Sequence, residues 1–351
     1  MPRTFKLCCI LLTLLLASRM ANGEEQRQEL SVEVRQLLDA LWPIRERLVS
    51  GECEIEEVIY ESFDTPPVPE SKSQIVFDSN SAAFRMEYSS FNDPDLSFKF
   101  VENQDEIARY SDEMKSMQIR SASQVTRKRR PLKLIDPRNL GIASWSEMDR
   151  RLLSDNRDAF LSYIDNCQSI RVEAATDNPA IRVLTFQGKK RTALRKIFLD
   201  PAKDFASVRL EIWYPRREGE GYEETPQEVD EITWTLDGNS WVPTKAIFTQ
   251  RDDRSVRREL DIVWKNVNGE IPHDEFASES LPLPPEATVY DGRTNPDHPM
   301  LVRGGSEHPA KSDGNSSRGS MSFVLLMILN LIIFVAIGAV MFIKRRSSNT
   351  T

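Results

Sequence analysis

The spacing of apolar residues changes along the chain, and each spacing predicts a different element. Over residues 29–49, apolar side chains recur every three or four positions, which predicts an amphipathic helix. Pro43 lies within this segment, so we expect the helix to kink or split there, because proline has no amide hydrogen to donate. Gly51 ends the pattern, and beyond it the apolar period becomes two.

Alternation of apolar with polar residues predicts antiparallel strands that have one apolar face and one solvent-facing face. Runs of Asp, Asn, Ser, Gly and Pro separate the alternating segments, as expected of turns. We expect about 11 or 12 strands. They lie within or around residues 55–61, 75–77, 84–88, 98–100, 117–119, 170–172, 181–183, 193–199, 208–214, 232–236, 242–248 and 260–264.

A central segment, 127–166, interrupts the strand series. Two short helices are expected in it, near 145–153 and 155–164. Strands that precede and follow inserted helices on one sheet are typical of an α+β fold. We therefore predict a single α+β domain with a large antiparallel sheet over residues 24–290.

The start of the chain has the features of a secretory signal peptide. Basic residues precede an apolar run at 7–17, which is too short to span a bilayer comfortably. Small residues at Ala21 and Gly23 then offer a cleavage site before Glu24. We interpret 1–23 as a signal peptide, and an uncleaved N-terminal anchor is the alternative.

The other end has the features of a membrane anchor. Residues 323–343 contain no charged side chain, and at about 1.5 Å per residue such a helix would span the hydrocarbon core. The basic residues that begin the tail 344–351 favour a cytoplasmic location for it. Residues 291–322, rich in Pro, Gly and Ser, are predicted to be a flexible stalk. We therefore expect a single-pass protein of the cell (inner) membrane, with its N-terminal domain outside the cytoplasm.

The charge of the chain excludes one class of partner. It carries 46 Lys and Arg against 54 Asp and Glu, a net charge of −8. Removing the basic residues of the predicted signal peptide and tail makes the exterior part more acidic still. Affinity for nucleic acid depends mainly on neutralising phosphates, so we expect no nucleic-acid partner.

Candidate chemistry is sparse. His273, His298 and His308 do not share a metal-ligand spacing, and no nucleophile elbow, phosphate loop or dinucleotide motif occurs. We therefore expect no metal, no cofactor and no catalytic residue. Cys53 and Cys167 are the cysteines left after signal cleavage, and we predict a disulfide between them, with two free thiols as the alternative.

Several motifs in the second strand series resemble a known family. They are Lys196-Ile197-Phe198-Leu199-Asp200-Pro201, Trp241-Val242-Pro243-Thr244 and Val263-Trp264-Lys265-Asn266-Val267-Asn268, followed by Ile271-Pro272 and Phe276. Together with the order of helix, strands, inserted helices and strands, they resemble the LolA-like fold of periplasmic lipoprotein carriers over residues 27–292. This resemblance implies a curved sheet that wraps the N-terminal helix and the inserted helices as an unclosed barrel, with an inner face that holds acyl chains.

The resemblance implies a binding module for a lipid, an acylated protein or another hydrophobic ligand. The predicted anchor, which soluble carriers of the family lack, would tether this module to the membrane. The inner-face residues expected to line its cavity are Phe84, Met86, Phe98, Phe100, Ile212 and Trp234. Alternation alone shows only that these residues face inward, and a packed core is the other interpretation. The alternative function is a ligand-free sensing or protein-interaction domain whose partner is another membrane protein.

Overall fold

The computed structural model describes most of the predicted exterior domain. The described residues are 30–60, 66–124, 130–148, 151–188, 192–216, 221–251, 256–297 and 299–303. The predicted signal peptide 1–23, the later part of the stalk, the segment 323–343 and the tail 344–351 lie outside them. None of the helices in the described part combines the length and the apolar character needed to cross a bilayer.

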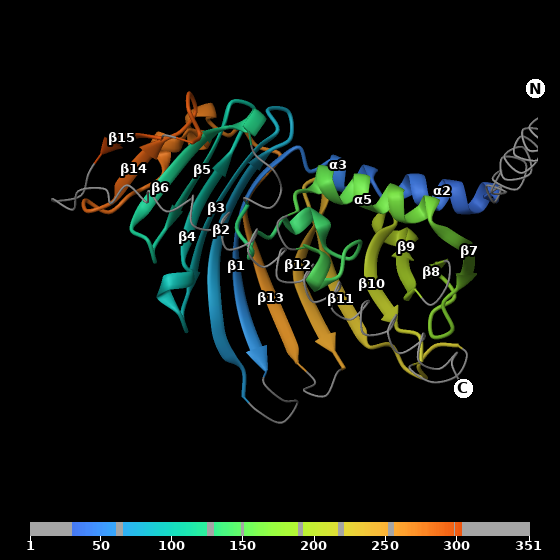
Figure 1. The fold of residues 1–351 in the computed structure, drawn as a ribbon. Coiled ribbons are helices and arrows are strands. Elements are labelled where there is room, and N and C mark those ends of the chain that lie inside the picture. Colours follow the sequence, from blue (N-terminus) through green and yellow to red (C-terminus); the bar gives the residue numbers. More distant parts are fainter. Residues whose placement is uncertain are drawn as a thin grey trace, which may run out of the picture. The chain divides into compact units, whose positions relative to one another are not determined.

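One 15-stranded sheet organises the described residues (Figure 1). Its strands are β1 (Ser50–Tyr60), β2 (Val68–Asp78), β3 (Ala83–Ser90), β4 (Phe98–Glu102), β5 (Glu106–Ser111), β6 (Ser116–Ser121), β7 (Cys167–Ala174), β8 (Arg182–Gly188), β9 (Leu194–Asp200), β10 (Ala206–Trp213), β11 (Glu228–Asp237), β12 (Ser240–Gln250), β13 (Arg257–Val267), β14 (Thr288–Asp291) and β15 (Met300–Arg303). Their spatial order is β15-β14-β6-β5-β4-β3-β2-β1-β13-β12-β11-β10-β9-β8-β7.

The sheet is unclosed and almost entirely antiparallel, as predicted. Its two edges are β15 and β7, and the β14–β6 pair is parallel whereas the other pairs are antiparallel. All the predicted strands are present. The additional ones are β5, β14 and β15. Because β15 pairs with β14, the folded unit extends to Arg303, beyond the boundary at 290 that the sequence suggested.

The helices form where the sequence predicts them. They are α2 (Val32–Ala40), α3 (Pro43–Glu46), α4 (Trp145–Met148) and α5 (Leu153–Asp165). Pro43 occupies the first turn of α3 and separates it from α2, which confirms the predicted split. Short 3₁₀ helices connect other elements: η1 (Pro94–Leu96), η2 (Ala122–Gln124), η4 (Pro137–Asn139), η5 (Pro201–Lys203), η6 (His273–Phe276) and η7 (Ser278–Ser280).

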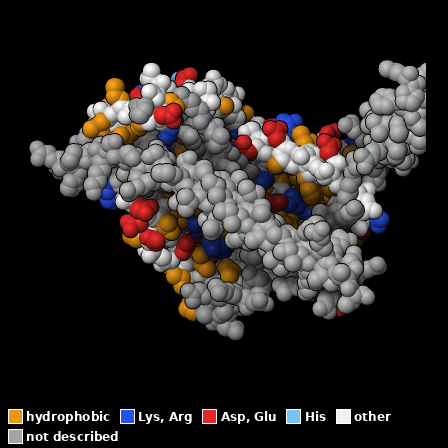
Figure 2. All heavy atoms as spheres, viewed as in Figure 1, with side chains coloured by type: hydrophobic (Ala, Val, Ile, Leu, Met, Phe, Trp, Pro, Cys, Tyr) orange, Lys and Arg blue, Asp and Glu red, His pale blue; other side chains and the backbone are white. Residues whose placement is uncertain are grey.

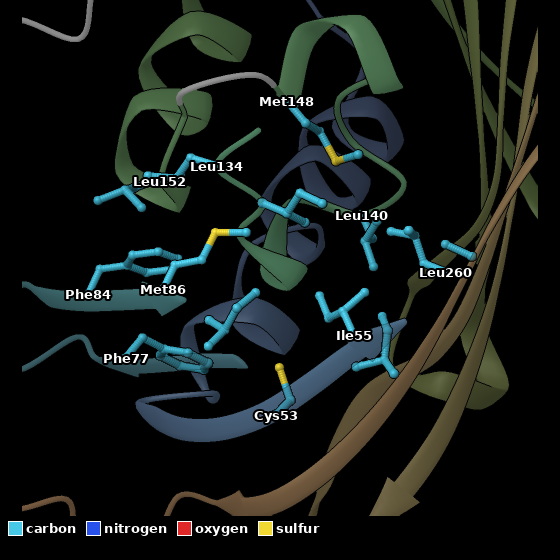
Figure 3. Packing of buried hydrophobic residues seen from close by; sticks show 14 of the residues in the cluster. Cys53, Ile55, Phe77, Phe84, Met86, Leu134, Leu140, Met148, Leu152 and Leu260 are labelled. Carbon is cyan, nitrogen blue, oxygen red and sulfur yellow. The ribbon is translucent and has the colours of Figure 1, made fainter. Parts of the chain in front are cut away.

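Two clusters of buried side chains fill the inner side of the sheet. The central cluster joins β1–β4 and β11–β13 to the segment that leads through η4 and α4, and Figure 3 shows Phe84 and Met86 pointing toward Leu134 and Leu152. The helical cluster packs α2 and α5 against β7–β10, with Phe160 and Phe186 in edge-to-face contact. The inserted helices therefore cover the second half of the sheet, as Figure 1 shows.

A third cluster lies on the other face of β2–β6. Val101, Ala108 and Ile119 belong to it, and the chain from 271 to 289 covers them. Phe276 is the largest covering side chain and is 1% exposed. In this half of the sheet both faces are buried, whereas the sequence predicts one solvent-facing face.

Candidate functional site

The six residues predicted to line an inner cavity are all buried. Their exposed fractions are 1% for Phe84, 0% for Met86, 3% for Phe98, 0% for Phe100, 5% for Ile212 and 3% for Trp234. All except Ile212 belong to the packed central cluster, which Leu134, Leu140 and Met148 fill from the helical side. The inserted segment therefore occupies the space along these strands, which agrees with the packed core that was the other interpretation of the alternation. Phe84 alone among them also borders a pocket described below.

The predicted disulfide is absent from the structure. Cys53 and Cys167 are free thiols, on β1 and β7 respectively. Seven strand-to-strand steps separate β1 from β7 in the sheet order, about 34 Å along the sheet at about 4.8 Å per step. A disulfide requires Cα atoms within about 7 Å. Burial raises the pKa of the Cys53 thiol, so it behaves as a core side chain rather than a reactive group.

A pocket of about 330 Å³ opens where α3, the β2–β3 turn and the start of α5 meet. Its apolar lining consists of Trp42, Ala82, Ala83, Phe84, Leu152 and Leu153. We call it the apolar pocket. Phe84 and Leu152 belong to the central cluster, while Trp42 belongs to the helical cluster, so the pocket lies at the junction between the two.

Charged side chains surround the opening of the apolar pocket. The Arg157 guanidinium lies 2.5 Å from a Glu46 carboxylate oxygen and 5.6 Å from the centre of the Trp42 ring. Asp78 and Asp158 add two further carboxylates. Figure 2 shows acidic and apolar side chains next to each other over the helices. The more exposed charged residues at the opening are thus three acids and one base, while the buried part of the lining is apolar except for Arg138.

The first turn of α5, which borders the apolar pocket, is capped by carboxylates. The Leu153 amide donates to Asp136 Oδ2 at 2.9 Å, and the Leu152 amide donates to Asp155 Oδ2 at 2.9 Å. Asp136 also pairs with Arg138, at 2.8 Å, and is fully buried. These contacts satisfy the amides that would otherwise attract a ligand anion to the helix N-terminus.

Arg45 is a buried cation that the sequence analysis did not single out. It is 0% exposed and donates to the backbone carbonyls of Leu41, at 2.7 Å, and Leu140, at 2.9 Å. Its guanidinium lies 5.7 Å from the centre of the Trp234 ring, and burial lowers its pKa to about 9. A sequence signal existed, since Arg45 follows Leu41 by four residues and therefore lies on the apolar stripe of the helical segment.

A second buried titratable group lies on β11. Asp230 is 2% exposed, and its Oδ2 atom has no hydrogen-bond partner. Burial and, after it, the neighbouring Glu228 carboxylate raise the pKa of Asp230 well above its ordinary value. Asp230 and Glu228 border a cavity of about 40 Å³ together with Trp145 and Arg258.

A metal site is not evident within the described ranges. No three His, Cys, Asp or Glu side chains in that part of the chain are grouped closely enough to hold a metal ion. His273 lies in η6, while His298 and His308 fall outside the described residues.

Comparison with known proteins gives likenesses of fold only. No family model and no curated protein matches the sequence. The structure is similar to a LolA superfamily protein from Nitrosomonas europaea (11% identity, TM-score 0.41, 72% of this chain and 100% of that one). It is also similar to a putative outer membrane lipoprotein-sorting protein domain from Vibrio parahaemolyticus (10% identity, TM-score 0.41, 70% of this chain and 98% of that one). A DUF1329 family protein from Desulfovibrio piger is similar as well (9% identity, TM-score 0.43, 71% of this chain and 99% of that one). These neighbours include the superfamily that the sequence resembles, and the likeness carries no information on a ligand.

Proposed function

We propose that this protein is a binding module, not an enzyme, and that it holds a hydrophobic ligand in the apolar pocket. The observation that carries the proposal is the pocket itself, about 330 Å³ with six apolar side chains in its lining. Ligand sites in proteins are typically concave, mainly apolar and about 300–1,000 Å³ in volume. Because the apolar pocket lies at the junction of the two core clusters, a bound ligand would extend the core rather than lie on the surface.

A lipid or an acylated protein fits this site by its chemistry. Each methylene that leaves water contributes about 0.8 kcal/mol, so an acyl chain gains affinity with every carbon that enters the pocket. The polar opening suits a ligand with an apolar end and a hydrated end. The resemblance of the sequence to lipoprotein carriers implies the same ligand class.

We further propose that the module works outside the cytoplasm while tethered to the inner membrane. The support comes from the sequence of the two ends, 1–23 and 323–351. Protease added to intact spheroplasts should remove the folded unit and leave a small C-terminal fragment. Protection of the folded unit would contradict this location.

Ligand binding is tested by titrating the full chain, in lipid nanodiscs, with a fluorescent fatty acid. Empty nanodiscs provide the blank. In the variant Ser154→Trp an indole enters the pocket from an exposed position of α5, so binding should weaken about tenfold or more. Ser162→Trp is the matched control, because Ser162 is exposed on the same helix and does not border the apolar pocket.

Two results would overturn the binding proposal. One is wild-type protein that binds the probe no better than empty nanodiscs at micromolar concentration. The other is equal binding by the two tryptophan variants, which would place the probe elsewhere on the protein.

A second candidate function, protein interaction, is favoured by a different observation. The edge strand β15 exposes Met300 (70%), Leu301 (51%) and Val302 (60%). An edge strand with apolar side chains can pair with a strand of another chain. If the fatty acid does not bind, and Leu301→Lys abolishes capture of a membrane-protein partner, this function replaces the first.

A further inference from the structure

A second pocket, of about 140 Å³, lies on the other side of α5 and has the opposite character. Its polar lining comes from Glu147, Arg151, Asn156, Tyr163 and Arg195. We call it the polar pocket. It is too small for an acyl chain and large enough for a small ion or a few water molecules.

Two buried N–H donors of the polar pocket have no acceptor. Asn156 is 2% exposed, and its Oδ1 accepts a hydrogen bond from Arg151 Nη1 at 3.3 Å. This contact fixes the orientation of the amide, because an arginine can only donate. Asn156 Nδ2 is consequently left without a partner, and so is the buried Arg151 Nε. Buried donors are nearly always paired in folded proteins, so these two indicate an occupant.

The charges around the polar pocket do not balance. Arg195 Nη2 donates to both Glu147 carboxylate oxygens, at 2.5 and 2.6 Å, and Arg151 also attracts this carboxylate at longer range. The nearby acids Glu228 and Asp230 border a separate cavity of about 40 Å³. The lining therefore carries two guanidinium groups against one carboxylate.

We propose that the polar pocket binds a small oxygen-bearing anion, a carboxylate or a phosphate, through Asn156 Nδ2 and Arg151 Nε. Such an anion supplies the missing acceptors and balances the excess positive charge of the lining, whereas a water molecule supplies acceptors only. It is either a free anion or the headgroup of a lipid, and the same two donors would hold it. This site is independent of the apolar pocket, whose opening is acidic.

The variant Asn156→Asp provides the sharpest test. Its carboxylate has nearly the shape of the amide and would place a built-in anion beside Arg151. We therefore expect the variant to unfold at a higher temperature than the wild type without ligand, and to lose its response to added anions. A purely structural asparagine would give the opposite result for stability.

The measurement is thermal unfolding of the full chain in nonionic detergent, followed by tryptophan fluorescence. Sodium phosphate and sodium acetate are compared with sodium chloride at equal ionic strength, and a short-chain lysophosphatidic acid represents the lipid headgroup. A bound anion should raise the wild-type unfolding temperature by about 5 °C or more at about 100-fold excess over its dissociation constant. Ser162→Asp is the control: it adds the same charge at an exposed position of α5 that borders neither pocket, and should keep the response.

The possible results distinguish a free anion from a lipid headgroup, and they also include results that overturn the proposal. Stabilisation by phosphate or acetate assigns a free anion, and stabilisation by the lipid alone assigns a headgroup, provided that Asn156→Asp abolishes the effect. Absence of any anion-specific shift in the wild type overturns the proposal, and so does a full response in Asn156→Asp. If that variant does not fold, Arg151→Gln is used instead, with at least about tenfold weaker anion binding expected by calorimetry.

Discussion

The two halves of the sheet are built from similar alternating sequences, yet they are covered differently. In β2–β6 the inner face packs on the central cluster, and the outer face packs under the chain from 271 to 289. In β9–β13 the inner face packs on core side chains and helices, while outward-facing positions carry ion pairs such as Lys265–Glu54 at 2.5 Å and Lys245–Glu259 at 2.8 Å. One half is therefore a buried layer and the other is a solvent-facing wall.

The difference comes from the C-terminal part of the domain and not from the strands alone. Arg85 binds Glu275 at 2.5 Å, and Asn103 Nδ2 donates to the Phe276 carbonyl at 2.7 Å. Glu106 accepts from the Ser278 amide at 2.8 Å, which fixes the next turn. These contacts hold the covering segment over β2–β6. The last segment of the predicted domain thus completes the core.

The helices and twelve strands could be predicted because the spacing of apolar residues within each element is a local property of the sequence. The sequence did not predict which face each apolar stripe occupies. Met117 and Ile119 alternate with polar residues just as Phe84 and Met86 do, yet Met117 and Ile119 lie on the outer face of the sheet. β5 was missed because it is buried on both faces, which removes the alternation from its sequence.

The candidate site was predicted less well than the fold. Only Phe84, among the residues expected to bind ligand, borders the apolar pocket. The pocket joins α3, the β2–β3 turn and the start of α5, which are far apart in sequence. Alternation along a strand cannot reveal such a junction. The same holds for Asn156 and Arg151, whose missing acceptors become visible only when α5 and the chain before it are placed.

The largest expected effect is a difference in unfolding free energy between the same substitution made in each half of the sheet. Val101, on β4, is 0% exposed in the outer cluster, whereas Val263, on β13, is 62% exposed. Val101→Asp buries an unpaired carboxylate and should lower the free energy of unfolding by about 4 kcal/mol or more. Val263→Asp should change it by about 0.5 kcal/mol or less. Urea unfolding measures both, and equal losses would mean that the outer face of β4 is not covered.

A second change tests the covering segment itself. Phe276→Ala removes its central side chain, which is 1% exposed, and should cost about 3–5 kcal/mol of unfolding free energy. Phe91→Ala is the matched control, because Phe91 is 55% exposed and should cost far less. Urea unfolding again provides the measurement. A small loss for Phe276→Ala would show that the segment is a loosely attached part of the stalk.

A third prediction concerns the inner face of the solvent-facing half. Because the folded-state pKa of Asp230 is raised, its protonated form stabilises the fold at low pH. This contribution is lost as the pH rises through the folded-state pKa. Asp230→Asn keeps a neutral side chain, so its unfolding free energy should fall less than that of the wild type as the pH increases. Glu231→Gln, at an exposed neighbour, should keep the wild-type pH dependence, and identical profiles for Asp230→Asn and the wild type would contradict the assignment.

The smallest effect is expected on the solvent-facing wall, at Lys245. Its ammonium lies 2.8 Å from Glu259 and 3.7 Å from Asp261, but its side chain is 38% exposed. Arg257 remains close to Glu259, so removing Lys245 does not leave that carboxylate unpaired. Lys245→Gln should therefore lower the free energy of unfolding by at most about 1 kcal/mol, and less at 1 M salt, where exposed charges are screened. Urea unfolding at low and high salt measures this. A loss as large as that of Val101→Asp, or one that salt does not reduce, would mean that the wall is a buried ionic layer and that the contrast between the two halves does not hold.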